Sequence, residues 1–104
     1  MKVVLTELAE ETLQEITDFL KYKWTQRELD SLLQDYYAFL SLLDDRIIKP
    51  RVYKTFDRKI HYALIGKKQV TIFFEFESEQ TIKILLFWAN KKNPSLLKNL
   101  LNKG

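Results

Sequence analysis

The hydrophobic period of the chain changes at Pro50, and this change constrains the fold more than any other feature. Before Pro50, apolar residues recur at the spacing of three and four that is typical of helices. After it, they alternate with polar residues, as in residues 70–77. Proline cannot continue a helix, and a period of two is that of a half-buried strand. The sequence therefore predicts an α+β fold, with two long helices before Pro50 and most of the strands after it.

Two helices are expected before Pro50. The first follows a short apolar strand at residues 3–5 and has Thr6 as its N-cap. Thr25 and Glu28 form a capping box that starts the second helix within a few residues, so the two helices form an antiparallel hairpin. We expect the hairpin to dock on the sheet through one apolar stripe, which consists of Leu13, Ile16, Leu20, Leu33, Tyr36 and Leu40.

The part of the chain after Pro50 predicts strands. Residues 51–56 and 59–65 are candidate strands, residues 70–77 and 81–88 follow, and Asn93-Pro94 begins a short final helix. We expect one domain, residues 1–104, with the order β-α-α-β-β-β(-α) and a helical hairpin packed on a small, mostly antiparallel sheet. Ile72, Phe74, Ile84 and Leu86 should share one sheet face. The opposite face should expose apolar side chains to a partner protein, namely Phe73, Leu85 and Phe87.

Composition excludes several classes of function. The chain has no Cys, which excludes disulfides and thiolate zinc sites and fits a reducing cytoplasm. His61 is the only histidine, so no metal site is expected. Gly66 and Gly104 are the only glycines, so the sequence has no Gly-rich phosphate loop, and no cofactor is expected. The first residues do not resemble a signal peptide, and no apolar run approaches the roughly 20 residues of a membrane span, so we expect a cytoplasmic protein without a membrane partner.

Charge is unevenly distributed along the chain. Residues 1–45 contain four Lys/Arg and ten Asp/Glu, a net charge of −6, whereas residues 46–104 contain thirteen and four, a net charge of +9. A basic sheet face could meet a polyanion or an acidic protein segment, although opposite charges on a solvated surface could also neutralise each other. Five basic residues are candidates for binding a target or a nucleic acid: Arg51, Lys54, Lys67, Lys68 and Lys92.

The order of these segments resembles the RelE/ParE toxin superfamily of type II toxin–antitoxin systems, and in particular its plasmid-stabilisation branch. The resemblance covers residues 3–97. It is carried by the first strand and helix at residues 4–16, the hairpin at residues 63–76, and the run Ile-Leu-Leu-Phe-Trp-Ala-Asn-Lys-Lys-Asn-Pro at residues 84–94. It implies a small, basic bacterial toxin that a cognate antitoxin neutralises. One branch of the family cleaves messenger RNA on the ribosome without a metal, and another inhibits DNA gyrase.

The residues that would perform RNA cleavage depart from the family pattern. By resemblance, the catalytic candidates of a nuclease are Arg58, His61 and Lys91. Phe74 stands where most relatives carry Tyr, and Lys91 replaces an Arg whose guanidinium can hold a phosphate with two parallel hydrogen bonds. These departures favour a ParE-like toxin that binds a protein such as DNA gyrase. A RelE-like, ribosome-dependent endoribonuclease and a degenerate, non-toxic family member remain as alternatives.

Overall fold

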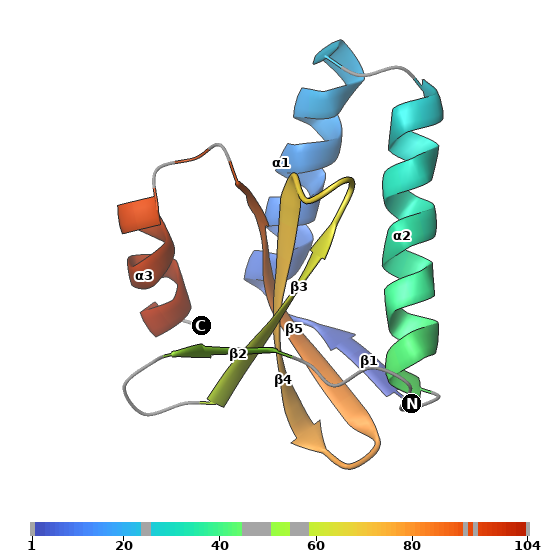
Figure 1. Ribbon diagram of the computed structural model, residues 1–104. Helices are drawn as coiled ribbons and strands as arrows, with labels where there is room; N and C mark the ends of the chain where they lie inside the picture. The colour runs from blue at the N-terminus through green and yellow to red at the C-terminus, as the bar shows by residue number, and fades with distance from the viewer. Residues whose placement is uncertain are drawn as a thin grey trace.

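The computed structural model describes residues 2–23, 26–44, 51–54, 59–90, 92 and 94–103, and its fold is mixed α+β (Figure 1). The α+β class predicted from the sequence is therefore confirmed. In chain order the elements are β1 (Lys2–Leu5), α1 (Glu7–Lys23), α2 (Gln26–Asp44), β2 (Arg51–Lys54), β3 (Lys59–Ile65), β4 (Val70–Ser78), β5 (Thr81–Ala89) and α3 (Pro94–Lys103). The predicted order β-α-α-β-β-β(-α) has three strands after the second helix, whereas the structure has four. The additional strand arises because β2 and β3 are separate strands that pair with each other.

The strands form one five-stranded sheet in the order β1-β5-β4-β3-β2. From β2 to β5 each strand pairs antiparallel with the next. β1 instead joins the edge of β5 and runs parallel to it, with Lys2 opposite Thr81 and Leu5 opposite Ile84. The first and last strands of the chain are thus neighbours in the sheet.

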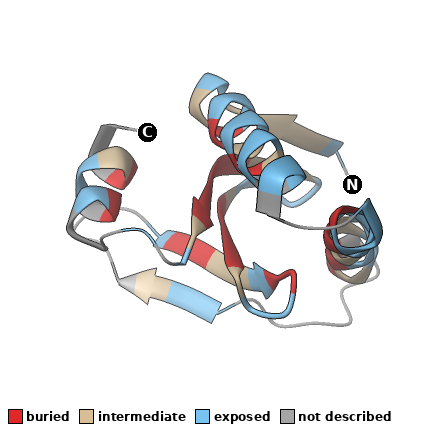
Figure 2. Cartoon of the chain, turned by 90° about the horizontal axis from the view of Figure 1, so that it is seen from above, coloured by how far each residue is buried: buried red, intermediate tan, exposed pale blue. Residues whose placement is uncertain are grey.

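Helices pack on both faces of this sheet (Figure 2). α1 and α2 cover one face, where Ile16, Leu32 and Phe39 are buried against sheet residues such as Ile72 and Phe74. α3 covers part of the other face. There a smaller buried cluster joins α3 to the sheet and consists of Ile60, Phe73, Leu85, Leu86, Trp88, Leu97 and Leu101.

The apolar stripe of α2 differs from the predicted one. Leu32 and Phe39 are buried, and the Phe39 ring meets the Phe74 ring edge-on at a centroid distance of 5.2 Å. Leu33, which the sequence analysis placed in the stripe, is 38% exposed, so this prediction was wrong. α2 has apolar residues on several sides, and the sheet selects the side that carries Leu32 and Phe39. Of the other stripe residues, Ile16 is buried, the side chain of Leu20 is outside the described part of the chain, and three are partly buried: Leu13, Tyr36 and Leu40.

A β-bulge in β5 changes which side chains reach each face. Phe73 pairs with Leu86 but Phe74 pairs with Ile84, so Leu85 is an extra residue in β5. Beyond the bulge, Phe87 belongs to the core under the hairpin, whereas Leu86 belongs to the cluster under α3. Phe73 and Leu85 therefore lie on the face opposite the hairpin, as predicted, whereas the predicted faces of Phe87 and Leu86 were wrong. The predicted exposure of Phe73, Leu85 and Phe87 to a partner was also wrong, because all three side chains are buried, the first two with residues of α3 and the third with residues of the hairpin.

Two threonines of the α1 region bond to the backbone of β5 beyond the end of β1. The Thr6 hydroxyl donates to the Leu85 carbonyl at 2.8 Å and accepts from the Ala9 N–H at 3.0 Å, which confirms Thr6 as the N-cap. The Thr12 hydroxyl donates to the Leu8 carbonyl at 2.8 Å and accepts from the Phe87 N–H at 3.0 Å. These hydroxyls thereby provide hydrogen-bond partners for backbone groups of β5 that lie beyond the end of β1.

The bond to Phe87 can be tested by changing Thr12. Thr12→Val keeps the shape of the side chain but leaves the buried Phe87 N–H without this acceptor, which should lower the free energy of unfolding by about 1–3 kcal/mol. Thr12→Ser keeps the hydroxyl and should lose less. Urea denaturation of both variants provides the measurement, and a valine variant as stable as wild type would contradict the role of this hydrogen bond.

Two neighbouring leucines of α2 test the position of its stripe. Leu32→Ala should lower the free energy of unfolding by about 2–5 kcal/mol because Leu32 is 2% exposed. The adjacent Leu33→Ala should cost less than about 1 kcal/mol because that side chain is partly in solvent. Equal losses in thermal or chemical denaturation would show that the stripe is placed incorrectly.

Candidate partner-binding groove

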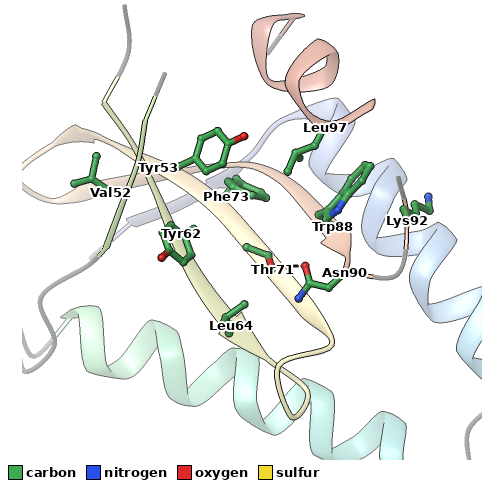
Figure 3. A pocket seen from close by; sticks show the side chains of 10 residues that line it. All are labelled: Val52, Tyr53, Tyr62, Leu64, Thr71, Phe73, Trp88, Asn90, Lys92 and Leu97. Atoms are coloured by element: carbon green, nitrogen blue, oxygen red, sulfur yellow. Dashed lines mark hydrogen bonds between the residues drawn. The ribbon is translucent and has the colours of Figure 1, made fainter. Parts of the chain in front are cut away.

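The sheet face opposite the helical hairpin has a groove of about 460 Å³ between β2 and α3 (Figure 3). We call it the β2–α3 groove. β3, β4 and β5 provide its floor, β2 lines one side, and Leu97 of α3 lines the other. Its lining consists of Val52, Tyr53, Tyr62, Leu64, Thr71, Phe73, Trp88, Asn90, Lys92 and Leu97. The strand register explains this grouping, because Tyr62 lies opposite Phe73 and Thr71 lies opposite Trp88.

Most of the groove is apolar, and its deepest rings are already packed. Phe73 and Trp88 are only 3% and 5% exposed, and the Tyr53 ring meets the Phe73 ring edge-on at 5.2 Å. Leu64 is more open, with 38% of its surface exposed. Val52 is 49% exposed, but it lies opposite His61 and its side chain points away from Tyr53 and Phe73 (Figure 3). The groove therefore offers the Leu64 side chain and ring edges to an incoming group.

Asn90 holds the polar end of the groove in place. Its Oδ1 accepts a hydrogen bond of 2.6 Å from the Thr71 hydroxyl, and its Nδ2 donates to the Lys68 carbonyl at 2.9 Å. The Asn90 N–H also donates to the Gln69 carbonyl at 2.9 Å. These bonds tie the residue after β5 to the turn between β3 and β4, so the turn has a fixed position beside the groove.

The turn itself has an unusual backbone. Gly66, Lys67 and Lys68 have φ angles of 60°, 56° and 67°, and the Gln69 N–H donates to the Gly66 carbonyl at 3.2 Å, as in a type I′ turn. From the hairpin side, Asp35 of α2 accepts a 3.0 Å bond from the Gly66 N–H. Left-handed conformation is unfavourable for Lys, so this turn keeps two exposed lysines at a cost in stability.

Lys92 lies at the same end of the groove. Its Nζ is 3.6 Å from the Glu15 carboxylate of α1 and 5.9 Å from the centre of the Trp88 ring. The side chains of Lys92 and Glu15 are 50% and 63% exposed, so this pair is solvated and contributes little to stability. Another carboxylate could replace that of Glu15 without the cost of breaking a buried pair.

His61 does not line the groove. It lies opposite Phe74 on the hairpin side of the sheet, and it is 8% exposed. Its ring stacks on the Phe74 ring at 5.6 Å and contacts the Phe76 ring edge-on at 5.1 Å. His61 is therefore a core residue, separated from the groove by the sheet.

The other candidates from the sequence divide into three groups. Lys67, Lys68 and Lys92 lie at the groove's polar end, and Arg51 is exposed on β2 opposite Tyr62. Lys54 lies in β2, but its side chain is outside the described part of the chain. Arg58 and Lys91 lie outside it with backbone and side chain alike.

The sequence analysis did not single out several residues of this region, among them Asp35, Tyr53, Tyr62, Leu64 and Asn90. The tyrosines had one signal, because both lie within predicted strands, at residues 51–56 and 59–65. The bonds of Asp35 and Asn90 join segments far apart in the chain, so nothing in the local pattern indicated them.

The described residues do not indicate a metal centre, since they contain no cluster of three or more His, Asp or Glu side chains. No helix in the described ranges has the length and apolar character of a membrane span. No model of a protein family matches the chain, and neither a curated protein nor a solved structure matches it. The arrangement itself, an apolar groove with cations at one end, is suited to binding.

The strain in the turn gives a prediction. Lys68→Gly should raise the free energy of unfolding by about 1 kcal/mol, because glycine occupies this position of a type I′ turn without the steric penalty. The same exchange at Lys83, within β5, should lower stability by about 0.5–1 kcal/mol because glycine weakens a strand. Thermal unfolding compares the two, and a glycine at position 68 that destabilises the protein would contradict the strained turn.

Proposed function

We propose that this protein is the toxin of a type II toxin–antitoxin pair of the RelE/ParE kind. It acts in the cytoplasm by binding a protein target such as DNA gyrase, and a cognate antitoxin neutralises it. The observation that carries the preference for binding over RNA cleavage is the position of His61. The only imidazole of the chain lies among Phe74 and Phe76, on the sheet face away from the groove, where it cannot transfer a proton to a substrate in that groove.

The arrangement of the segments that resemble the family supports the proposal. β1 and α1 both lie against β5, and β5 leads directly into the Asn-Lys-Lys-Asn-Pro run before α3. The segments that carry the resemblance at the two ends of the chain thus form one structural unit. A mainly apolar groove with Lys92 at one end lies on this sheet and gives a protein partner a surface to bind.

The nuclease alternative has one observation in its favour. The lining of the groove includes two tyrosines, Tyr53 and Tyr62, and, at its other end, Lys92 (Figure 3). A phenol can transfer a proton and an ammonium can offset phosphate charge. Arg58 and Lys91, which the resemblance assigns to cleavage, would have to complete such a site.

Induced expression in a bacterial host separates these activities. We expect growth arrest with DNA breaks and intact messenger RNA, and recovery of growth when the product of the adjacent gene is co-expressed. Unchanged growth at a verified level of folded protein would instead identify a non-toxic family member and contradict the proposal.

Variants of the same expression test identify the mode of action. His61→Phe retains an aromatic ring in the core and should leave toxicity unchanged, whereas Lys91→Ala combined with Lys92→Ala should weaken it because a basic patch serves binding. Protein levels measured by immunoblot control for folding. Cleavage of messages at ribosome-bound codons that disappears in the His61→Phe variant would favour the nuclease.

A further inference from the structure

We propose that β1 pairs with the β1 strand of a second copy of this chain, so that two five-stranded sheets join into one continuous sheet. The two strands run antiparallel about a two-fold axis at Val4. Val3 of each copy then lies opposite Leu5 of the other copy. This self-association does not depend on the proposed function.

The side of β1 that faces away from β5 is an open backbone edge. Lys2 and Thr6 donate their N–H groups to carbonyls on the β5 side, at 2.7 and 3.0 Å. Successive residues of a strand direct their N–H and C=O groups to opposite sides, so those of Val3 and Leu5 point away from β5. In the described part of the chain β1 contacts only β5 and α1, and α1 packs on a face of the sheet (Figure 1). No other described element therefore covers this edge.

The open edge is complementary to itself under a two-fold rotation. In an antiparallel ladder, residues of a hydrogen-bonded pair exchange both of their backbone groups. Placing Val3 opposite Leu5 of the other copy therefore satisfies the outward groups of both residues in each chain. The side chains agree with this register, because Val3 and Leu5 pack against the core under the hairpin and would extend it across the junction. Val4 would meet its own copy on the other face.

Charge distinguishes this edge from the opposite edge of the sheet. β2 carries a cationic residue at each end, Arg51 and Lys54, so an antiparallel copy of β2 would bring like charges together. β1 carries only Lys2, which would lie opposite Thr6 of the other copy, just before the acidic first turn of α1. The signs of the charges therefore favour self-pairing through β1 and oppose it through β2.

The junction is small, because it joins two strands of four residues each. It buries less than the about 1,200 Å² of a standard interface, so we expect a dissociation constant of about 1–100 μM. Sedimentation velocity of the full-length chain at rising concentration should show a shift from the mass of one chain, 12.5 kDa, toward twice that mass. A chain that is still monomeric at about 1 mM would overturn the proposal and leave the edge to a strand of another protein.

Val3→Pro tests the backbone contact itself. Proline removes the outward N–H of residue 3 and leaves the N–H groups that donate to β5 in place, so the fold should persist while dimerisation weakens at least about tenfold. Val3→Ala is the matched control, because it also removes side-chain atoms but keeps the N–H. Circular dichroism and thermal unfolding establish that both variants fold. Equal dimerisation of the two variants would overturn the pairing of backbones.

Val4 tests the two-fold axis, because a residue on the axis lies opposite its own copy. Val4→Lys and Val4→Glu should each be monomeric, since each places like charges directly opposite one another. An equimolar mixture of the two variants should form a heterodimer, because the introduced charges are then opposite. Native mass spectrometry separates the heterodimer from both homodimers by mass. Homodimers at the wild-type level, or a mixture that stays monomeric, would overturn the axis at Val4.

Val52→Lys is the control at the other edge of the sheet. Val52 lies in β2 and is 49% exposed, so a charge there should leave both the fold and the dimer unchanged. A dimer that Val52→Lys disrupts and Val4→Lys leaves intact would place the junction at β2 and overturn the proposal.

Discussion

The extra residue at Leu85 determines how β5 is shared between the two faces of the sheet. Without this bulge, the strict alternation of the strand would turn Leu86 and Trp88 toward the helical hairpin and Phe87 toward α3. With it, Phe87 contacts Tyr36 of α2 through an edge-on ring pair at 5.6 Å, and Trp88 lines the β2–α3 groove. The Thr12 hydroxyl bonds to the Phe87 N–H just beyond the bulge, so the position of α1 and the composition of the groove depend on the same short stretch of β5.

Local rules predicted much of the fold. Thr6 is an N-cap because a hydroxyl before a helical stripe can bond to the free N–H groups of the first turn. The change of period after Pro50 indicated the strands, because side chains on a strand alternate between two faces whatever the rest of the protein does. These features depend on residues that are neighbours in the chain, which is why the sequence alone reveals them.

The errors arose where distant segments compete. Leu32 and Leu33 are both good candidates for the core, and only the position of the sheet decides that Leu32 is buried. A bulge leaves no signal in an uninterrupted apolar run such as residues 84–88, because every residue there is compatible with either face. The candidate groove could be predicted only in part. Its basic residues stand out in the sequence, whereas the grouping of Tyr53, Tyr62 and Trp88 depends on strand register.

The pKa of the Tyr36 phenol also depends on packing. Burial of Tyr36, and to a smaller extent the nearby Tyr37, raises this pKa.

The pairing of β1 with β5 has a consequence for how the chain acquires its structure. Contacts such as that between Thr6 and Leu85 join residues 79 positions apart, so they form only after a long loop has closed. During synthesis on the ribosome, the opening strand and α1 lack the strand that they bond to until β5 has emerged. A high proportion of such distant contacts slows folding, and in the meantime it leaves apolar surface open to chaperones or to any partner that binds the nascent chain.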